Sequence, residues 1–152
     1  MPKETREYMN ELLRDLGKAS GLTGAALDAR GCFALSLDGA VFTVMCRKET
    51  EEACLLHTLG PLPQEREERA RVSAFLLEQN CFFRGVGAGV LGVFAGEIHY
   101  TLRLVPQNLT YADFERMLLF TVDLCADLKR QMNGTKASPS APEADVTRMV
   151  RV

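Results

Sequence analysis

The side chains most capable of chemistry in this sequence are its thiols and imidazoles. Two histidines stand at positions 57 and 99, and five cysteines are spread along the chain: Cys32, Cys46, Cys54, Cys81 and Cys125. No two cysteines have the Cys-x-x-Cys spacing of a zinc site or a redox-active dithiol, so neither is predicted. Their odd number and apolar surroundings favour small buried side chains in a reducing compartment.

A nucleophilic thiol needs a base beside it, and Cys54 and His57 are the candidates nearest in sequence. They are three residues apart in an expected strand, so their side chains point to opposite faces and cannot pair. His99 could approach either one in the folded chain. A thiol-dependent enzyme using Cys54, His57 or His99 therefore stays as the less favoured alternative. We assign no catalytic residue, no metal ligand and no cofactor.

A glycine pattern, Gly87-x-Gly89-x-x-Gly92, matches the dinucleotide-binding fingerprint letter for letter. That motif needs a strand before it and a helix after it, so that the pyrophosphate meets the helix N-terminus. Here the glycines lie in or beside an expected strand, and another strand follows. We interpret them as a glycine-rich loop or a bulged, closely packed strand.

Composition sets the class of protein. The chain has 152 residues, of which 47% are hydrophobic and 25% charged, which is typical of one soluble globular domain. Its net charge of -2 gives no basic footprint for nucleic acid. No apolar run approaches a membrane span, and the N-terminus lacks the apolar core of a secretory signal. We therefore expect a cytoplasmic protein that binds neither nucleic acid nor membrane.

Hydrophobic periodicity predicts three helices and five strands. The first helix carries an apolar stripe, Met9, Leu12, Leu13 and Leu16, at helical spacing. Asp38-Gly39 joins two β-prone runs as a hairpin, and Thr110-x-x-Asp113 is a capping box that opens the last helix. The expected helices cover about residues 5–18, 63–80 and 110–132, and the expected strands cover residues 32–37, 41–46, 53–59, 89–94 and 98–104.

The predicted class is therefore α+β, in the order α-β-β-β-α-β-β-α, with a twisted antiparallel sheet of five strands packed with three helices. We expect one domain over residues 1–134. Residues 135–152 are predicted to be a Ser/Pro/Ala-rich linker and C-terminal tail, with strand-like alternation from Val146 to Val152. The strands carry more apolar alternation than three helices need to cover, which indicates a surface for a partner.

The element order and several local sequences resemble the class I type III secretion chaperones, the Tir-chaperone (CesT) family. The resemblance extends over about residues 5–132. The matching segments are residues 12–17, 31–38, 41–44, 59–63, 76–80, 89–92, 98–103 and 114–128. The tail beyond Gly134 is longer than in short members of that family.

The resemblance implies a non-enzymatic homodimer in the bacterial cytoplasm. Such a chaperone binds an extended segment near the N-terminus of an effector, keeps it secretion-competent and presents it to the secretion apparatus, whose ATPase is a further candidate partner. An extended peptide can add a strand to a sheet edge while its apolar side chains enter a groove. The family's groove, between the first helix and the first strands, maps here to Leu12, Leu13, Leu16, Phe33, Leu35, Phe42 and Val44.

For the dimer contact, we expect the second helix and the fourth strand to meet their copies in the partner subunit. The apolar residues assigned to it are Val72, Phe75, Leu76, Val90, Leu91 and Val93. One alternative besides the thiol enzyme stays open, namely a small dimeric scaffold or regulator that binds a folded partner.

Overall fold

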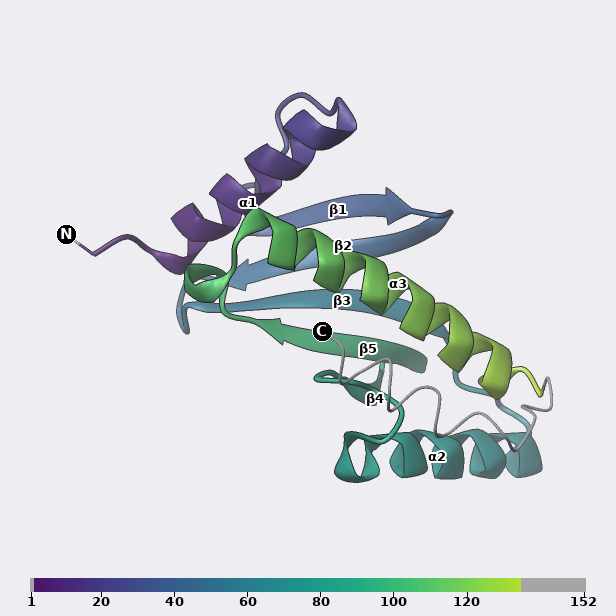
Figure 1. The fold of residues 1–152 in the computed structure, drawn as a ribbon. Helices are drawn as coiled ribbons and strands as arrows, with labels where there is room; N and C mark the ends of the chain where they lie inside the picture. Colours follow the sequence, from purple (N-terminus) through teal and green to yellow (C-terminus); the bar gives the residue numbers. More distant parts are fainter. Residues whose placement is uncertain (1, 135–152) are drawn as a thin grey trace.

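The structure, a computed structural model, describes residues 2–134. Three helices and five strands follow one another in the predicted order (Figure 1), so the α+β class is confirmed. The strand-like pattern at 146–152 and the linker before it lie outside the described residues. The elements are α1 Thr5–Ser20, β1 Cys32–Leu37, β2 Ala40–Arg47, β3 Glu52–Pro61, α2 Arg66–Asn80, the short 3₁₀ helix η1 Cys81–Phe83, β4 Val90–Phe94, β5 Glu97–Leu104, the 3₁₀ helix η2 Pro106–Asn108 and α3 Tyr111–Met132.

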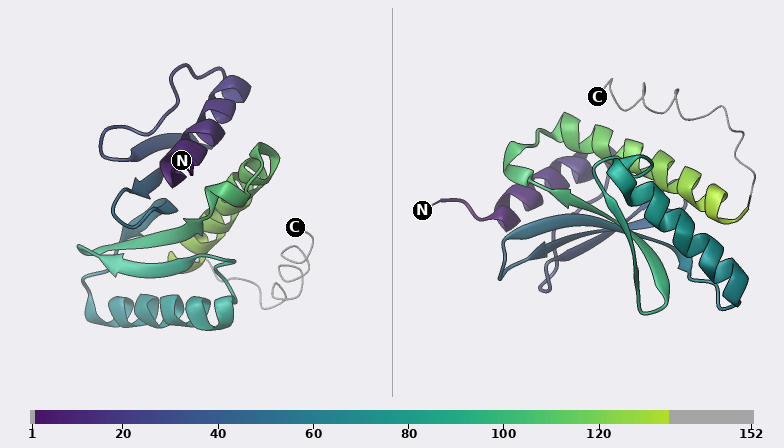
Figure 2. Two further views of the ribbon diagram at one scale, coloured as in Figure 1. Left: turned by 90° about the vertical axis from the view of Figure 1, so that its left-hand side faces the viewer. Right: turned by 90° about the horizontal axis from the view of Figure 1, so that it is seen from below.

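All five strands form one antiparallel sheet in the order β1-β2-β3-β5-β4. Because β5 lies between β3 and β4, the two edges of the sheet are β1 and β4. The sheet is twisted, as Figure 2 shows from two further directions. Helices α1 and α3 cover one face, while α2 lies beside the β4 edge (Figure 1).

Two tight hairpins fix the register at these edges. Asp38 and Gly39 both have positive φ angles, 50° and 79°, which matches the twist that a two-residue hairpin turn requires. The β4–β5 hairpin has the same form, with φ angles of 52° at Ala95 and 78° at Gly96. The predicted Asp38-Gly39 hairpin is thus confirmed.

The core lies between the sheet and the pair α1 and α3. Alternate residues of each central strand point into it, and the alternation predicted for β5 is confirmed, with four buried side chains at every second position. The largest side chains at the centre of this layer are Tyr100, Phe42, Phe114, Met9, Leu13 and Leu55.

Capping side chains set where the helices begin. Thr110 Oγ1 accepts the Asp113 N–H at 3.1 Å and the Asp113 carboxylate accepts the Thr110 N–H, which confirms the predicted capping box of α3. Helix α2 begins at Arg66, three residues later than predicted, because the Glu65 carboxylate accepts the N–H groups of Glu67 and Glu68 and so acts as its N-cap. None of the helices within residues 2–134 is both long and apolar enough to cross a membrane.

Candidate functional site

The seven residues predicted to form a groove belong to one hydrophobic cluster of the structure, on the face of the sheet that α1 covers. Six of them belong to the buried core of the protomer: Leu12, Leu13, Leu16, Leu35, Phe42 and Val44. Leu13 has no exposed surface at all, with an exposed fraction of 0%. Phe33 is the seventh, and it is half-buried at the margin of the core, as is Leu37, which lies four residues further along β1 on the same face.

Beside this margin, the β1 edge presents backbone groups to the outside. The Gly31 carbonyl accepts the Cys46 N–H at 2.8 Å, so β1 residues at odd positions turn their backbone groups toward β2. The backbone groups of Cys32, Ala34 and Ser36 therefore point away from the sheet. Those of Ala34 and Ser36 have no hydrogen-bond partner among residues 2–134. This is a free edge, two pairing positions long.

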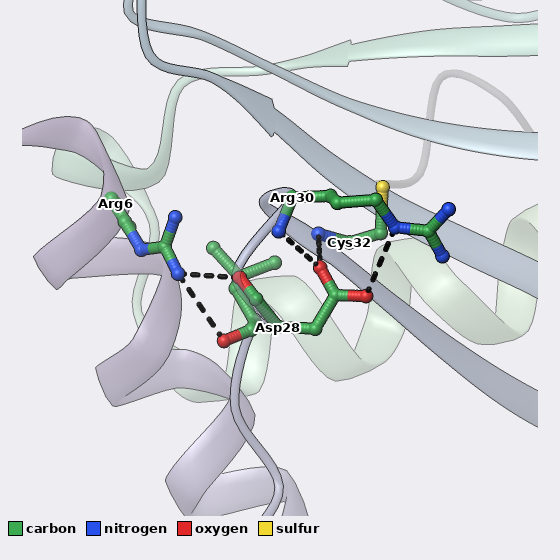
Figure 3. Close-up of polar contacts among 5 residues, drawn as sticks. Arg6, Asp28, Arg30 and Cys32 are labelled. Atoms are coloured by element: carbon green, nitrogen blue, oxygen red, sulfur yellow. Dashed lines mark hydrogen bonds and ion pairs between the residues drawn. The ribbon is translucent and has the colours of Figure 1, made fainter.

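Asp28 closes the start of that edge (Figure 3). Its carboxylate accepts the Cys32 N–H at 2.9 Å, and its own N–H donates to the Cys32 carbonyl at 2.8 Å. The hydrogen bond from the Cys32 amide, with that from the Arg30 amide, holds the pKa of the Asp28 carboxyl below its usual value. Arg6 of α1 donates to the carbonyls of Asp28 and Leu27 and thereby ties this segment to the helix.

The backbone at Gly31 explains how the segment turns into β1. A Cβ atom at this position would stand 2.3 Å from the Cys46 carbonyl oxygen, and its φ angle is +82°. Only glycine adopts this conformation and this approach without strain. No sequence pattern marks this closure, because Asp28 and Cys32 are recognisable as partners only once β1 is placed as an edge strand.

The opposite edge carries an exposed apolar surface. Of the six residues predicted for a dimer contact, Val72, Leu76 and Leu91 are buried within the protomer, Phe75 is half-buried, and Val90 and Val93 are exposed. The structure adds four exposed apolar side chains near them that the sequence reasoning missed. We call the resulting set the β4 patch: Leu77, Phe82, Phe83, Val90, Val93 and Phe94.

Phe82 and Phe83 show why part of the β4 patch was not predicted. Both follow α2 in η1, where no helical or strand period marks a face, and both have positive φ angles, 54° and 56°. Bulky side chains seldom adopt this left-handed conformation. Phe82 is 89% exposed, which leaves an apolar ring in water beside a strained backbone.

The thiols and imidazoles do not assemble into a reactive group. Cys54 lies opposite Arg103 on the sheet, and His57 points to the other face, where Phe42 stacks on its ring. Burial raises the pKa of the Cys54 thiol and raises that of Cys46 to about 11, so both are held as thiols near neutral pH. Among the described residues, no three His, Cys, Asp or Glu side chains are placed to hold a metal ion.

Both histidines border a shallow hollow of about 720 Å³, together with Asp38 and Lys129. The Nδ1–H of His57 donates to the Val41 carbonyl at 2.8 Å, while His99 Nδ1 lies 3.1 Å from the Thr58 hydroxyl. No cysteine lines this hollow. The hollow therefore brings the imidazoles together with charged groups but not with a thiol.

Comparison with known proteins places this fold. The sequence model of the Tir chaperone protein (CesT) family matches residues 11–129, most of the chain. The chain belongs to this family. Among curated proteins, none matches the sequence at a significant level.

Several solved structures share the fold of this CesT-family chain at low sequence identity. A chain of the ExsC–ExsE complex is 19% identical, with a TM-score of 0.68 over 88% of this chain and 100% of that one. A chain of the HopA1–SchA chaperone–effector complex is 16% identical, with a TM-score of 0.64 over 85% and 99%. The Yersinia pestis type III secretion chaperone SycH, solved with a fragment of YscM2, gives 18% identity and a TM-score of 0.59 over 80% and 98%. At these identities the likeness establishes the fold.

Two surfaces of the CesT-family chain therefore remain without a partner in the described residues: the β1 edge with its half-buried aromatic margin, and the β4 patch. One offers backbone groups, and the other offers apolar side chains. Their different chemistry suits two different partners.

Proposed function

We propose that this chain is a non-catalytic type III secretion chaperone of the bacterial cytoplasm. It binds an extended segment near the N-terminus of an effector, keeps that segment secretion-competent and presents it to the secretion apparatus, whose ATPase is a candidate partner. Family membership supports the chaperone role, and the neighbour from the HopA1–SchA complex is described as part of a chaperone–effector complex. The observation that carries the proposal is the free β1 edge.

The β1 edge suits an extended chain better than a folded surface. Ala34 and Ser36 offer two amides and two carbonyls to a strand laid beside them. A side chain of that strand opposite Leu35 would point to the inner face, between the half-buried side chains of Phe33 and Leu37. Burial of one leucine-sized side chain there contributes about 1.5–3 kcal/mol to binding.

The predicted groove residues take unequal parts in this proposal. Phe33 has surface available for direct contact. The other six residues are buried in the core cluster against which Phe33 packs. Contact between the effector and Leu13 would need α1 to move off the sheet. We therefore propose Phe33, with its neighbour Leu37, as the principal apolar contact.

A homodimer is the second part of the proposal. The β4 patch comprises six exposed apolar side chains on α2, η1 and β4. Exposed apolar surface of this kind marks an interaction site, and a second copy of the same chain is the commonest partner. This arrangement keeps the β1 edge of each subunit free for the effector.

The test uses capture and mapping together. The tagged full chain is used to isolate its client from the native host, and the client is then digested while bound. We expect a protected, extended segment near the client's N-terminus, and we expect Ser36→Pro to abolish capture. Proline at an outward-facing edge position removes one docking amide but no bond of the β1–β2 ladder. Ser36→Thr, which keeps the backbone amide at the same position, is the matched control and should retain the client.

Two results would contradict the proposal. A client that keeps its tertiary structure when bound would identify a scaffold for folded partners instead. Capture that is equal for wild type and Ser36→Pro would remove the β1 edge as the binding site.

A further inference from the structure

The start of the β1 edge is already occupied by a residue of the chain itself. Asp28 accepts from the Cys32 N–H through Oδ1, at 2.9 Å, and donates its own N–H to the Cys32 carbonyl, at 2.8 Å. Two such bonds to one residue are what an opposing residue on a neighbouring antiparallel strand would make. Asp28 thus fills the first of three outward-facing positions of β1.

Several contacts hold Asp28 in this place (Figure 3). Its Oδ1 also accepts the Arg30 N–H at 2.9 Å, and the Arg30 guanidinium lies 3.8 Å from Oδ2. Arg6 donates to the Asp28 carbonyl at 2.5 Å, and Asn10 accepts the Leu27 N–H at 2.9 Å. The segment that carries Leu27 and Asp28 is therefore anchored to α1 at two points.

Resting on the proposed function, we propose that Asp28 is the register stop for the effector strand on β1. With Cys32 closed, an incoming strand hydrogen-bonds only to Ala34 and Ser36 and turns away from the sheet at Cys32. The partner is thus an extended segment that places one apolar side chain opposite Leu35. A slip by one residue would turn every incoming side chain to the other face, so fixing the register selects the effector's sequence.

At the β4 edge, too, a side chain of the chain itself pairs with an outward-facing backbone position, which supports this interpretation. The Asn80 side chain both donates to and accepts from the backbone of Leu91. The remaining outward position of β4 is Val93, so that edge offers one pairing position where β1 offers two. The longer row of unpaired backbone groups is therefore on β1, next to the half-buried side chains of Phe33 and Leu37.

The experiment measures backbone amide exchange by NMR in the full chain. The probe is the synthetic strand acetyl-Lys-Thr-Thr-Val-Thr-Thr-Lys-amide, whose single valine marks the register, in unlabelled form and with a nitroxide at its N-terminus. In wild type, saturating peptide should slow exchange at Ala34 and Ser36 by about tenfold, the effect of roughly one hydrogen bond. The exchange rates of the Asp28 and Cys32 amides should not change. The nitroxide should broaden one set of signals, which corresponds to a single register of the peptide.

Two variants test the stop itself. Asp28→Ala removes the acceptor for the Cys32 N–H, so peptide protection should spread to Cys32 and the nitroxide should broaden a second set of signals. Asp28→Asn keeps an acceptor oxygen and should behave as wild type. Ser36→Pro should abolish protection in every background.

Each outcome is decisive. If Asp28→Ala binds the peptide in the wild-type register, the register stop is wrong while strand addition at β1 stands. If no variant shows protection at Ala34 and Ser36, both this inference and the proposed use of the β1 edge fail. Should Asp28→Ala not fold, the wild-type spectra decide, because faster exchange of the Asp28 amide on peptide addition would mean that Asp28 is displaced and the stop does not exist.

Discussion

Asn80, the last residue of α2, pairs with Leu91 of β4 as a neighbouring strand would. Its side-chain amide donates to the Leu91 carbonyl at 2.8 Å and accepts the Leu91 N–H at 2.8 Å. One side chain thereby joins the end of a helix to the edge of the sheet. This pair helps to hold α2 beside β4, together with the buried side chains of Val72 and Leu76.

Removing the pair should weaken the fold measurably. We expect Asn80→Ala to lower the free energy of unfolding by about 1–3 kcal/mol, because two hydrogen bonds are lost and the backbone of Leu91 is left without its partner. Urea unfolding measures the loss, and faster exchange of the Leu91 amide locates it. Glu78→Ala, an exposed change on the same helix end, is the control and should stay within about 0.5 kcal/mol of wild type.

Gly89 and Gly92 of the fingerprint-like pattern should respond very differently to an added methyl group. A Cβ at Gly89 would lie 2.3 Å from the Tyr100 ring, whereas a Cβ at Gly92 would meet nothing within 4 Å. The Tyr100 ring cannot retreat easily, since its hydroxyl donates to the Val86 carbonyl at 2.9 Å in the buried core. Gly89→Ala should therefore cost about 1–3 kcal/mol by overpacking. Gly92→Ala should be close to neutral, and equal losses at both sites would contradict this account of the pattern.

His57 should make stability depend on pH. Burial lowers the pKa of its imidazole in the folded state, and the positive charge of Lys129 acts in the same direction. The unfolded chain, with a pKa near 6.5, therefore binds the proton more readily than the folded chain. Stability should be full above pH 6.5 and fall as the pH drops below that value. Urea unfolding at a series of pH values measures this fall.

The matched variants for this prediction are His57→Asn and His99→Asn. An asparagine amide can replace the donor to the Val41 carbonyl without titrating, so His57→Asn should flatten the pH dependence between neutral and mildly acidic conditions. His99→Asn should leave the dependence in place. A slope that survives in His57→Asn would assign it to other groups.

Leu13 and Phe33 separate the core from the proposed contact surface. Leu13 is fully buried, so Leu13→Ala should cost about 2–5 kcal/mol of stability through the cavity that it leaves. Phe33 is half-buried, so Phe33→Ala should cost less stability but weaken capture of the client by tenfold or more, since about 1.4 kcal/mol corresponds to a decade in affinity. Thermal melting and capture of the client are measured on both variants. Normal capture by a folded Phe33→Ala would exclude that side chain from the site.

Local patterns predicted most of the fold, because each depends on residues close in sequence. Asp38-Gly39 specifies its own turn, and Thr110 with Asp113 caps its own helix. An apolar stripe such as that of α1 cannot reveal whether its side chains meet the chain's own sheet or a partner. The Asp28–Cys32 and Asn80–Leu91 pairs could not be predicted either, since their meaning depends on which strands form the edges of the sheet.

The β4 patch yields the prediction on assembly. Phe94 is 77% exposed at the tip of the β4–β5 hairpin, and Phe82 of η1 is 89% exposed. If a second subunit covers these rings, a charge at Phe94 must be desolvated on association, and the dimer should dissociate. Light scattering at micromolar concentration should give a dimer for wild type and a monomer for Phe94→Asp. Leu119→Asp, an exposed change on α3 away from the patch, should remain dimeric. A monomeric wild type would remove the dimer from the proposal, and a dimeric Phe94→Asp would place its interface elsewhere.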